Sequence, residues 1–150
     1  MFSLILFEPE IPPNTGSIAR LCACTDSNLH LIRPLGFSTD DKHLKRAGLD
    51  YWHFVNVSYY DAFDELLKKN PTSRYFLFSS KATKLHTQAE YQSEDYLVFG
   101  PETRGLPDEL KERFADNLLT IPMFNATRSI NLAMSVGIAT YEALRQIKGF

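Results

Sequence analysis

Short apolar runs recur along this chain, and segments long enough to form helices separate most of them. Several runs are continuously apolar, as expected for strands that are covered on both faces of a sheet. This alternation predicts an α/β fold with a mostly parallel sheet and helices on both faces. The expected strands are Ser3–Phe7, Leu29–Arg33, Phe54–Val57, Tyr75–Phe78, Tyr96–Phe99 and Asn117–Ile121, and the expected helices are Thr15–Thr25, Lys42–Ala47, Tyr60–Lys69, Pro107–Ala115 and Asn131–Lys148.

The length of 150 residues predicts a single domain over residues 1–150, because domains cluster at roughly 100–150 residues. No apolar run approaches the roughly 20 residues that cross a bilayer. "FSLILF" near the start lacks the basic flank and the cleavage site of a signal peptide. We therefore expect a cytoplasmic protein with no membrane partner. Cys22 and Cys24 would point about 200° apart on a helix, so we expect reduced, mostly buried thiols and no disulfide.

The net charge of −2 limits how the chain can contact nucleic acid, because nucleic-acid-binding proteins usually carry a basic excess. Any RNA contact must use local basic clusters or a surface built from two subunits. The candidate clusters are Lys42, Lys45 and Arg46 in "DKHLKR" and Lys81 and Lys84 in "KATK". Taken alone, each is more typical of a solvated face.

The last expected helix places apolar and small side chains along one face. Docking onto the chain's own sheet accounts for part of that face. Its small residues would also let a second copy of the chain approach closely and form a dimer. The residues of this face are Ala133, Val136, Gly137, Thr140, Tyr141, Leu144 and Ile147.

Three clusters of polar residues and glycines each follow an expected strand. The first is "PNTGSIAR", in which Asn14 can cap a helix and Gly16 leaves backbone donors free. Arg20 follows, and an arginine can grip a phosphate through two parallel hydrogen bonds. A capped helix with a surface arginine is an equally good interpretation of this cluster alone.

The second cluster is "LVFGPETRGLP", an apolar run that ends in a stiff loop. Gly100 has no Cβ, so a ligand could lie against its main chain, and Gly105 can adopt left-handed angles. Glu102 offers acceptors for hydroxyls or an ammonium group, and Arg104 offers a fork of donors. Ligands of open α/β sheets sit beyond the carboxyl ends of the strands, where this loop would lie.

The third cluster, "IPMFNATRSINLA", again runs from a strand through a loop into a helix. Ile121, Met123 and Leu132 could form an apolar slot for a flat ring, while Ser129 and Asn131 supply hydrogen bonds. A simple strand-to-helix turn with Ser and Asn as caps would explain the same residues.

Missing motifs narrow the class of ligand. Neither G-x-G-x-x-G after a strand nor G-x-x-x-x-G-K-[ST] occurs, so a pyrophosphate or triphosphate has no usual cradle. The four histidines show no metal-ligand spacing, and no G-x-S-x-G elbow supports hydrolysis. A cofactor with an adenosine and no phosphate suits these loops, and S-adenosylmethionine is such a molecule.

Together, in this order, the three clusters resemble the SpoU branch of the SPOUT superfamily of RNA methyltransferases. The flanks "LFEPEIPPNTG" and "DDKHLKRAGLDYW" are most similar to that branch's small tRNA (cytidine/uridine-34) 2′-O-methyltransferases. The resemblance covers essentially the whole chain. It implies methylation of the wobble nucleotide of tRNA with S-adenosylmethionine and without a metal. It also implies a C-terminal trefoil knot and a homodimer with its sites at the subunit interface. Many enzymes of the branch carry a separate RNA-binding domain, for which we expect no room in 150 residues.

The same resemblance implies roles for individual residues. Arg20 falls on the family's catalytic arginine and Asn14 on the asparagine of the same motif. The family account makes Arg20 the base, yet a guanidinium normally keeps its proton in proteins. We prefer a role in gripping RNA phosphate and stabilising the developing alkoxide. The expected cofactor-binding residues are Phe78, Gly100, Glu102, Ile121, Met123, Ser129 and Leu132, and the expected substrate-binding residues are Lys42, Arg46, Arg104 and Tyr141.

Two positions depart from the family pattern, Ser17 where many relatives carry asparagine and Ala133 where serine is common. Neither removes a proposed catalytic group. Three alternative functions stay open at this point. A related methyltransferase acting on ribosomal RNA or on another tRNA position is the strongest, followed by a non-catalytic RNA-binding module. A nucleotide-dependent oxidoreductase would need a phosphate cradle that the sequence lacks.

Overall fold

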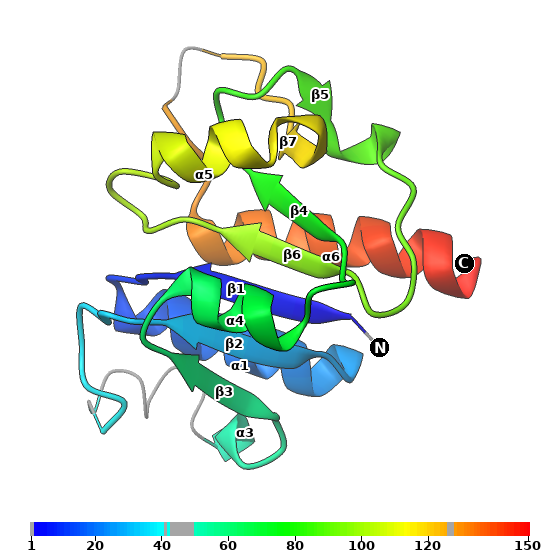
Figure 1. The fold of residues 1–150 in the computed structure, drawn as a ribbon. Coiled ribbons are helices and arrows are strands. Elements are labelled where there is room, and N and C mark those ends of the chain that lie inside the picture. Colours follow the sequence, from blue (N-terminus) through cyan, green and yellow to red (C-terminus); the bar gives the residue numbers. More distant parts are fainter. Residues whose placement is uncertain (1, 41, 43–49, 126–127) are drawn as a thin grey trace.

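The computed structural model describes residues 2–40, 42, 50–125 and 128–150. Within these residues, seven strands form one sheet in the order β3-β2-β1-β6-β4-β7-β5 (Figure 1). Every neighbouring pair in this sheet is parallel. The strands are β1 (Ser3–Phe7), β2 (Asn28–Ile32), β3 (Val57–Tyr60), β4 (Tyr75–Phe78), β5 (Lys84–Leu85), β6 (Tyr96–Phe99) and β7 (Leu118–Thr120).

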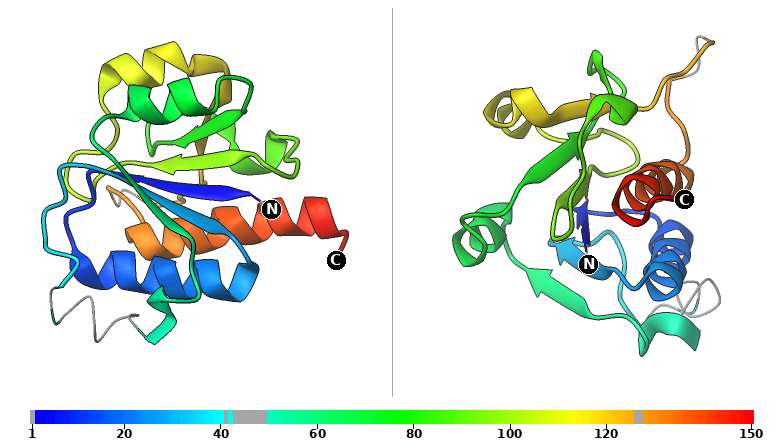
Figure 2. Two further views of the ribbon diagram at one scale, coloured as in Figure 1. Left: turned by 60° about the horizontal axis from the view of Figure 1, so that its bottom comes forward. Right: turned by 90° about the vertical axis from the view of Figure 1, so that its right-hand side faces the viewer.

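Helices cover both faces of this sheet, which confirms the predicted α/β architecture (Figure 2). On one face α1 and α6 pack against each other, and on the other lie α4 and α5. An ion pair between Arg113 Nη1 and Asp64 Oδ1 at 2.7 Å joins α5 to α4. The helices are α1 (Pro12–Thr25), α3 (Asp50–Trp52), α4 (Phe63–Lys69), α5 (Asp108–Arg113) and α6 (Leu132–Lys148), with 3-10 turns η2 (His86–Gln88) and η3 (Ala115–Asn117).

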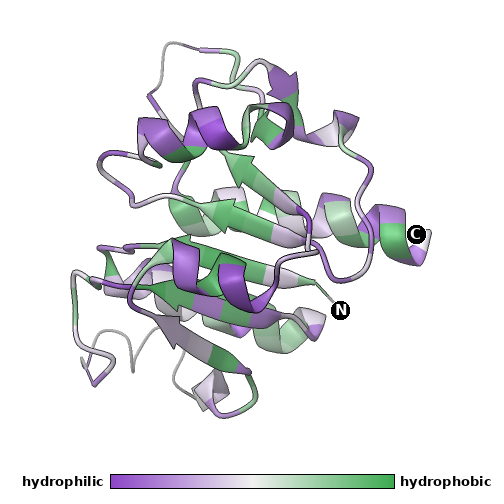
Figure 3. Ribbon diagram, viewed as in Figure 1, coloured by the Kyte–Doolittle hydropathy of each residue, from purple (hydrophilic) through white to green (hydrophobic). Residues whose placement is uncertain are grey.

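Each face of the sheet carries its own apolar core, and the strands are the most apolar part of the fold (Figure 3). In β1, Leu4 and Leu6 join the core beneath α1 and α6, while Ile5 and Phe7 join the core beneath α4 and α5. Side chains of a strand alternate between the two faces, so a strand covered on both sides needs an unbroken apolar run. This explains why the central strands are continuously apolar in sequence.

Some expected boundaries are wrong. The strand expected at Phe54–Val57 is β3 at Val57–Tyr60, and the helix expected from Tyr60 begins at Phe63. α1 begins at Pro12 because proline suits a first helical turn, so Asn14 lies inside the helix and is not its cap. β5 was not expected. The helix expected at Lys42–Ala47 falls mostly outside the described residues, and of it only the exposed Lys42 is described.

The thiols and the last helix confirm only part of the sequence expectation. Cys22 is buried, and burial raises the pKa of its thiol to about 12, whereas Cys24 is exposed. Both are free. On α6, Val136, Thr140 and Leu144 face the sheet as predicted, but Tyr141 is 52% exposed and does not. Among the described helices, none combines the length and apolar character needed to span a membrane.

His30 predicts an acid-dependent stability. Its side chain on β2 is 8% exposed, and neither ring nitrogen has a hydrogen-bond partner among the described residues. Burial lowers the pKa of His30 to about 4. At this position only the unfolded chain takes up a proton as pH falls from about 6.5 to about 4, so the contribution of His30 to stability falls by about 3 kcal/mol over that window and is unchanged above it.

The measurement is urea unfolding between pH 4 and pH 7.5, with His30→Phe as the test variant and His53→Asn as the control. His30→Phe should make the free energy of unfolding less dependent on pH, while replacement of the exposed His53 should leave that dependence unchanged. Equal slopes for the wild type and His30→Phe would contradict the assignment.

Candidate active site

A cavity of about 610 Å³ opens at the carboxyl ends of β4, β6 and β7. Because all strands are parallel, the loops that follow them meet at one edge of the sheet, where ligands of open α/β folds bind. The volume lies within the roughly 300–1,000 Å³ of small-molecule sites. Its lining includes all seven expected cofactor-binding residues, Phe78, Gly100, Glu102, Ile121, Met123, Ser129 and Leu132, together with Asn14 and Arg104.

One part of the cavity is aromatic and aliphatic. Phe78 at the end of β4 and Phe99 at the end of β6 stack with ring centroids 4.6 Å apart and planes 15° apart. Ile121, Met123 and Leu132 contribute half-buried apolar side chains from the third cluster. Such a set suits a flat heterocyclic ring better than a charged group.

A hydrogen-bonded chain of three side chains ties the three clusters together. Glu102 Oε2 accepts the backbone N–H of Glu10 at 2.8 Å, and its Oε1 accepts the N–H of Ile11 at 3.1 Å and Asn14 Nδ2 at 3.2 Å. Asn131 Nδ2 donates to Asn14 Oδ1 at 3.1 Å. Thus the loops after β1, β6 and β7, far apart in sequence, are fixed to one another.

Groups at both ends of this hydrogen-bonded series determine which of its atoms donate and which accept. The N–H of Met134 donates to Asn131 Oδ1 at 3.3 Å, which caps α6 and leaves the amide nitrogen of Asn131 to donate. At the other end the backbone N–H groups require acceptors, which a carboxylate supplies on both oxygens. Because protein donors occupy both oxygens of Glu102, its geometry favours a positioning role over the expected direct contact with a ligand.

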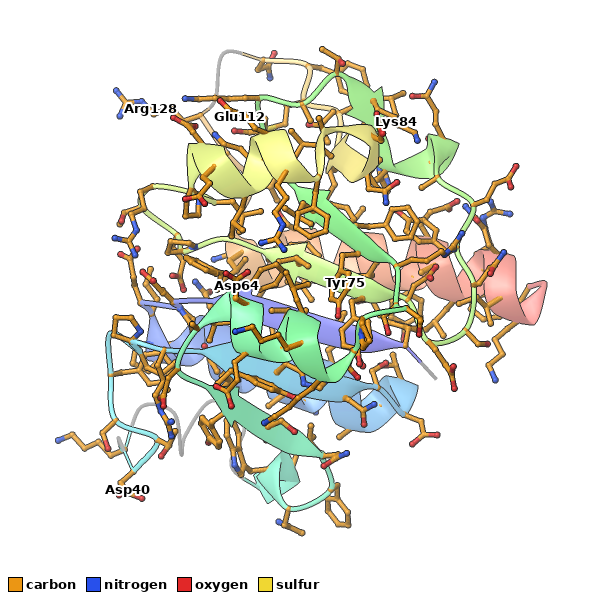
Figure 4. The ribbon with its side chains drawn as sticks, in the orientation of Figure 1. Asp40, Asp64, Tyr75, Lys84, Glu112 and Arg128 are labelled. Atoms are coloured by element: carbon orange, nitrogen blue, oxygen red, sulfur yellow. The ribbon has the colours of Figure 1, made fainter. Side chains whose placement is uncertain are left out.

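Glu102→Gln should therefore cost about 1–3 kcal/mol of stability and weaken cofactor binding, because the new amide would set a donor against the backbone N–H donors of Glu10 and Ile11. Thermal unfolding and calorimetric titration with S-adenosylmethionine would measure both effects. The matched control is Glu112→Gln on the outer surface of α5 (Figure 4), which should change neither. Equal behaviour of the two variants would contradict the positioning role.

Gly100 lines the cavity, and the packing of its own loop gives a second reason for a glycine at this position. A Cβ there would lie 2.5 Å from the carbonyl carbon of Gly105 and closer still to the nitrogen of Leu106. The backbone of its own loop, not a ligand, occupies that space. Gly105 has a φ of +69°, which confirms the predicted left-handed angle, and its N–H donates to Pro101 O at 3.0 Å.

Basic and hydroxyl side chains form the rim of the cavity. Arg104 is paired with Glu8, and Thr103 Oγ1 donates to Glu10 at 2.8 Å. Lys81, Arg104 and Lys111 also line an adjoining hollow of about 480 Å³. The guanidinium of Arg104, which we expected to contact the substrate, thus lies at the rim and is already paired with Glu8. Arg128, labelled in Figure 4, lines the cavity from the loop after β7 and projects from the edge of the fold.

Of the other expected substrate and catalytic residues, Arg20, Tyr141 and Lys42 do not line this cavity in a single chain. Arg20 is exposed on α1, with its guanidinium carbon 4.8 Å from the ring centroid of Tyr51. It follows Asn14 by six residues, which turns it about 240° around the helix and moves it about 9 Å along it. Tyr141 is exposed on α6, Lys42 is exposed, and Arg46 lies outside the described residues.

Sequence reasoning missed several residues of the cavity wall. The segment "SSK" directly follows β4, just as the three predicted clusters follow their strands. That position after a strand end could have indicated that the segment lines the cavity. Ser135 was missed because it lies one turn inside α6. The lining residues that the sequence analysis did not predict are Ser79, Ser80, Lys81, Thr120 and Ser135.

A parallel α/β sheet with a partly apolar cavity at its strand ends is typical of proteins that bind a small ligand at that edge of the sheet. The chain belongs to the SpoU rRNA methylase family, whose model matches residues 1–141.

Individual relatives agree with this assignment. The chain is 51% identical over 148 residues to the tRNA (cytidine(34)-2′-O)-methyltransferase of Saccharophagus degradans, covering 98% of this chain and 96% of the relative. It is 47% identical to a protein solved in a study of 2-OH methylation of C/U34 on tRNA, with a TM-score of 0.96 over 100% of this chain and 98% of that one. The AdoMet-bound rRNA methyltransferase of Sinorhizobium meliloti shares the fold at 22% identity and a TM-score of 0.86, over 96% of this chain and 56% of that one.

Proposed function

We propose that this chain is an S-adenosylmethionine-dependent tRNA 2′-O-methyltransferase that acts on the wobble nucleotide, cytidine or uridine 34. The observation that carries the proposal is the 51% identity, over nearly the full length of both chains, to the Saccharophagus degradans enzyme named for that reaction. The match to the SpoU family supports the same class of reaction.

The cavity fits the cofactor. Its stacked phenylalanines and aliphatic side chains suit an adenine ring, and polar groups at the rim suit the amino-acid end. S-adenosylmethionine supplies an electrophilic methyl group when bound. We assign its binding to Phe78, Gly100, Ile121, Met123, Ser129 and Leu132, with Glu102 and Asn14 holding the loops that carry them.

The chain's own contribution to the reaction is positioning and charge stabilisation. Holding the ribose hydroxyl and the methyl group in line can contribute ~7–11 kcal/mol. A guanidinium normally stays protonated in proteins, so we assign Arg20 to the RNA phosphate and to the developing alkoxide and not to proton removal. No metal is assigned a role. Among the described residues, no three His, Cys, Asp or Glu side chains gather as metal ligands.

A homodimer completes the proposal, because Arg20 and the cavity lie apart in one chain. Met134, Ile138 and Tyr141 are 66%, 42% and 52% exposed and share one outer face of α6, which a second copy would cover. We therefore move Tyr141 from RNA contact to this interface, and leave Lys42, Arg46 and Arg104 as RNA contacts. Light scattering should give twice the mass of 17.1 kDa, whereas a monomer would contradict this part. The C-terminal trefoil knot and a cytoplasmic location remain part of the proposal.

Substrate choice is tested by comparing RNA classes. Purified protein, labelled S-adenosylmethionine and either unmodified tRNA or ribosomal RNA should yield label on tRNA alone. Label on ribosomal RNA would favour the related rRNA reaction. RNA binding without calorimetric binding of the cofactor would identify a non-catalytic RNA-binding module.

A further inference from the structure

Arg20 contacts an aromatic side chain, Tyr51, to which the proposed reaction assigns no role. Its guanidinium carbon lies 4.8 Å from the ring centroid of Tyr51, within the distance of a cation–π contact. The Arg20 side chain is exposed on α1. The ring of Tyr51 therefore restrains a side chain that otherwise lies at the surface.

The backbone that carries Tyr51 is held by its surroundings. It belongs to α3, which packs on α1, and the neighbouring Trp52 packs against the core beneath α1 and α6. The turn that follows is closed by Phe54 N donating to Tyr51 O at 3.0 Å and Val55 N donating to Trp52 O at 3.2 Å. The backbone of Tyr51 is thus held relative to α1, the helix that carries Arg20.

Contact with an aromatic face has a specific consequence for arginine. The guanidinium is planar, so a ring that covers one face leaves its N–H donors, which point outward in the plane, free for two parallel hydrogen bonds. A long side chain on an exposed helix surface would otherwise sample many orientations. A guanidinium that is already restrained loses less conformational freedom when it binds a phosphate or an alkoxide.

We propose that Tyr51 is a positioning residue for Arg20, holding the guanidinium flat so that its free edge meets the RNA. This inference rests on the proposed function, because it assigns Tyr51 to the reaction that Arg20 serves. It adds an aromatic side chain outside the cofactor cavity to the machinery of methyl transfer.

The kinetic test is a double-mutant cycle on tRNA methylation. Tyr51→Leu should lower kcat/KM for tRNA about tenfold, and Tyr51→Phe, which keeps the ring, should stay within about threefold of the wild type. In an Arg20→Ala background, Tyr51→Leu should have no further effect, because its partner is gone. Single-turnover assays with excess enzyme keep the slow variants measurable.

A matched control exists on the same molecule. Arg33 lies over the ring of Tyr59 at 5.1 Å, so Tyr59→Leu removes a similar pair elsewhere on the surface. It should leave methylation of tRNA unchanged. Calorimetry should give the same affinity for S-adenosylmethionine in the wild type and in Tyr51→Leu, since Tyr51 does not line the cavity.

Proton NMR of the arginine side chains tests the contact without any activity. The Hε resonance of Arg20 should be shifted upfield by the ring of Tyr51, and the shift should persist in Tyr51→Phe and vanish in Tyr51→Leu. Additive losses in the cycle, or an unshifted Arg20 resonance in the wild type, would overturn the inference. A protein that shows the shift but methylates no tRNA would instead overturn the proposed function, and with it the assignment of the contact to catalysis.

Discussion

Replacing Arg20 with alanine is expected to lower kcat/KM for tRNA methylation by about 10²–10³, the usual loss when one donor to a developing oxyanion is removed. The loss should fall on methyl transfer and RNA binding and not on the cofactor, because Arg20 does not line the cavity. Steady-state kinetics with tRNA, together with calorimetry of S-adenosylmethionine, separate the two.

Arg20→Lys distinguishes the geometry of the side chain from its charge. Lysine keeps the positive charge but cannot form two parallel hydrogen bonds, so we expect it to recover only a small part of the lost activity. Lys68→Ala, which removes an exposed cation from α4 on the opposite face of the sheet, is the control for net charge and should change little. Near-full activity of Arg20→Lys would mean that the fork is unnecessary.

Gly100→Ala is expected to have the second large effect, this time on the cavity itself. The added methyl would meet the backbone at Gly105 and Leu106 at distances that no real Cβ tolerates, and backbone cannot turn aside as a side chain can. We expect a loss of about 2–3 kcal/mol in stability, as for overpacked sites. That is a fall of about 5–10 °C in Tm for a chain of this size, with at least tenfold weaker binding of S-adenosylmethionine.

Gly105→Ala, in the same loop, is the matched control for Gly100→Ala. Nothing lies within 4 Å of a Cβ at Gly105, but its φ of +69° makes alanine strained by about 1 kcal/mol. The Gly105 variant should therefore be the milder one in both thermal unfolding and calorimetry. If Gly100→Ala were as stable as the wild type, the loop could not be as closely packed as the structure has it.

The central part of the fold was predictable because its strands are buried on both faces. "YFLF" and "YLVF" are unbroken apolar runs between turns, and both became strands with the expected bounds. At the edge of the sheet β3 is only half-buried, so its sequence "VSYY" shows no such run and the boundary was misplaced. β5 has two residues, too few for any periodicity to indicate a strand.

The candidate site was predictable in its parts but not in its connections. The positions of Glu102, Asn14 and Asn131 after strand ends indicated that they would meet at one edge of the sheet. Their mutual hydrogen bonds join residues 88 and 117 apart in sequence, and no local pattern encodes such a pairing. The contact between Arg20 and Tyr51 was equally hidden, because it depends on how α3 packs on α1.

Mapping the methyl group in tRNA tests the account most directly. Unmodified tRNA treated with this protein and labelled S-adenosylmethionine should carry the label on the ribose 2′-oxygen of nucleotide 34, the position named for the relative that is 51% identical. Under conditions where calorimetry shows the cofactor bound, absence of label at that oxygen, or label on a base or another nucleotide, would contradict the account.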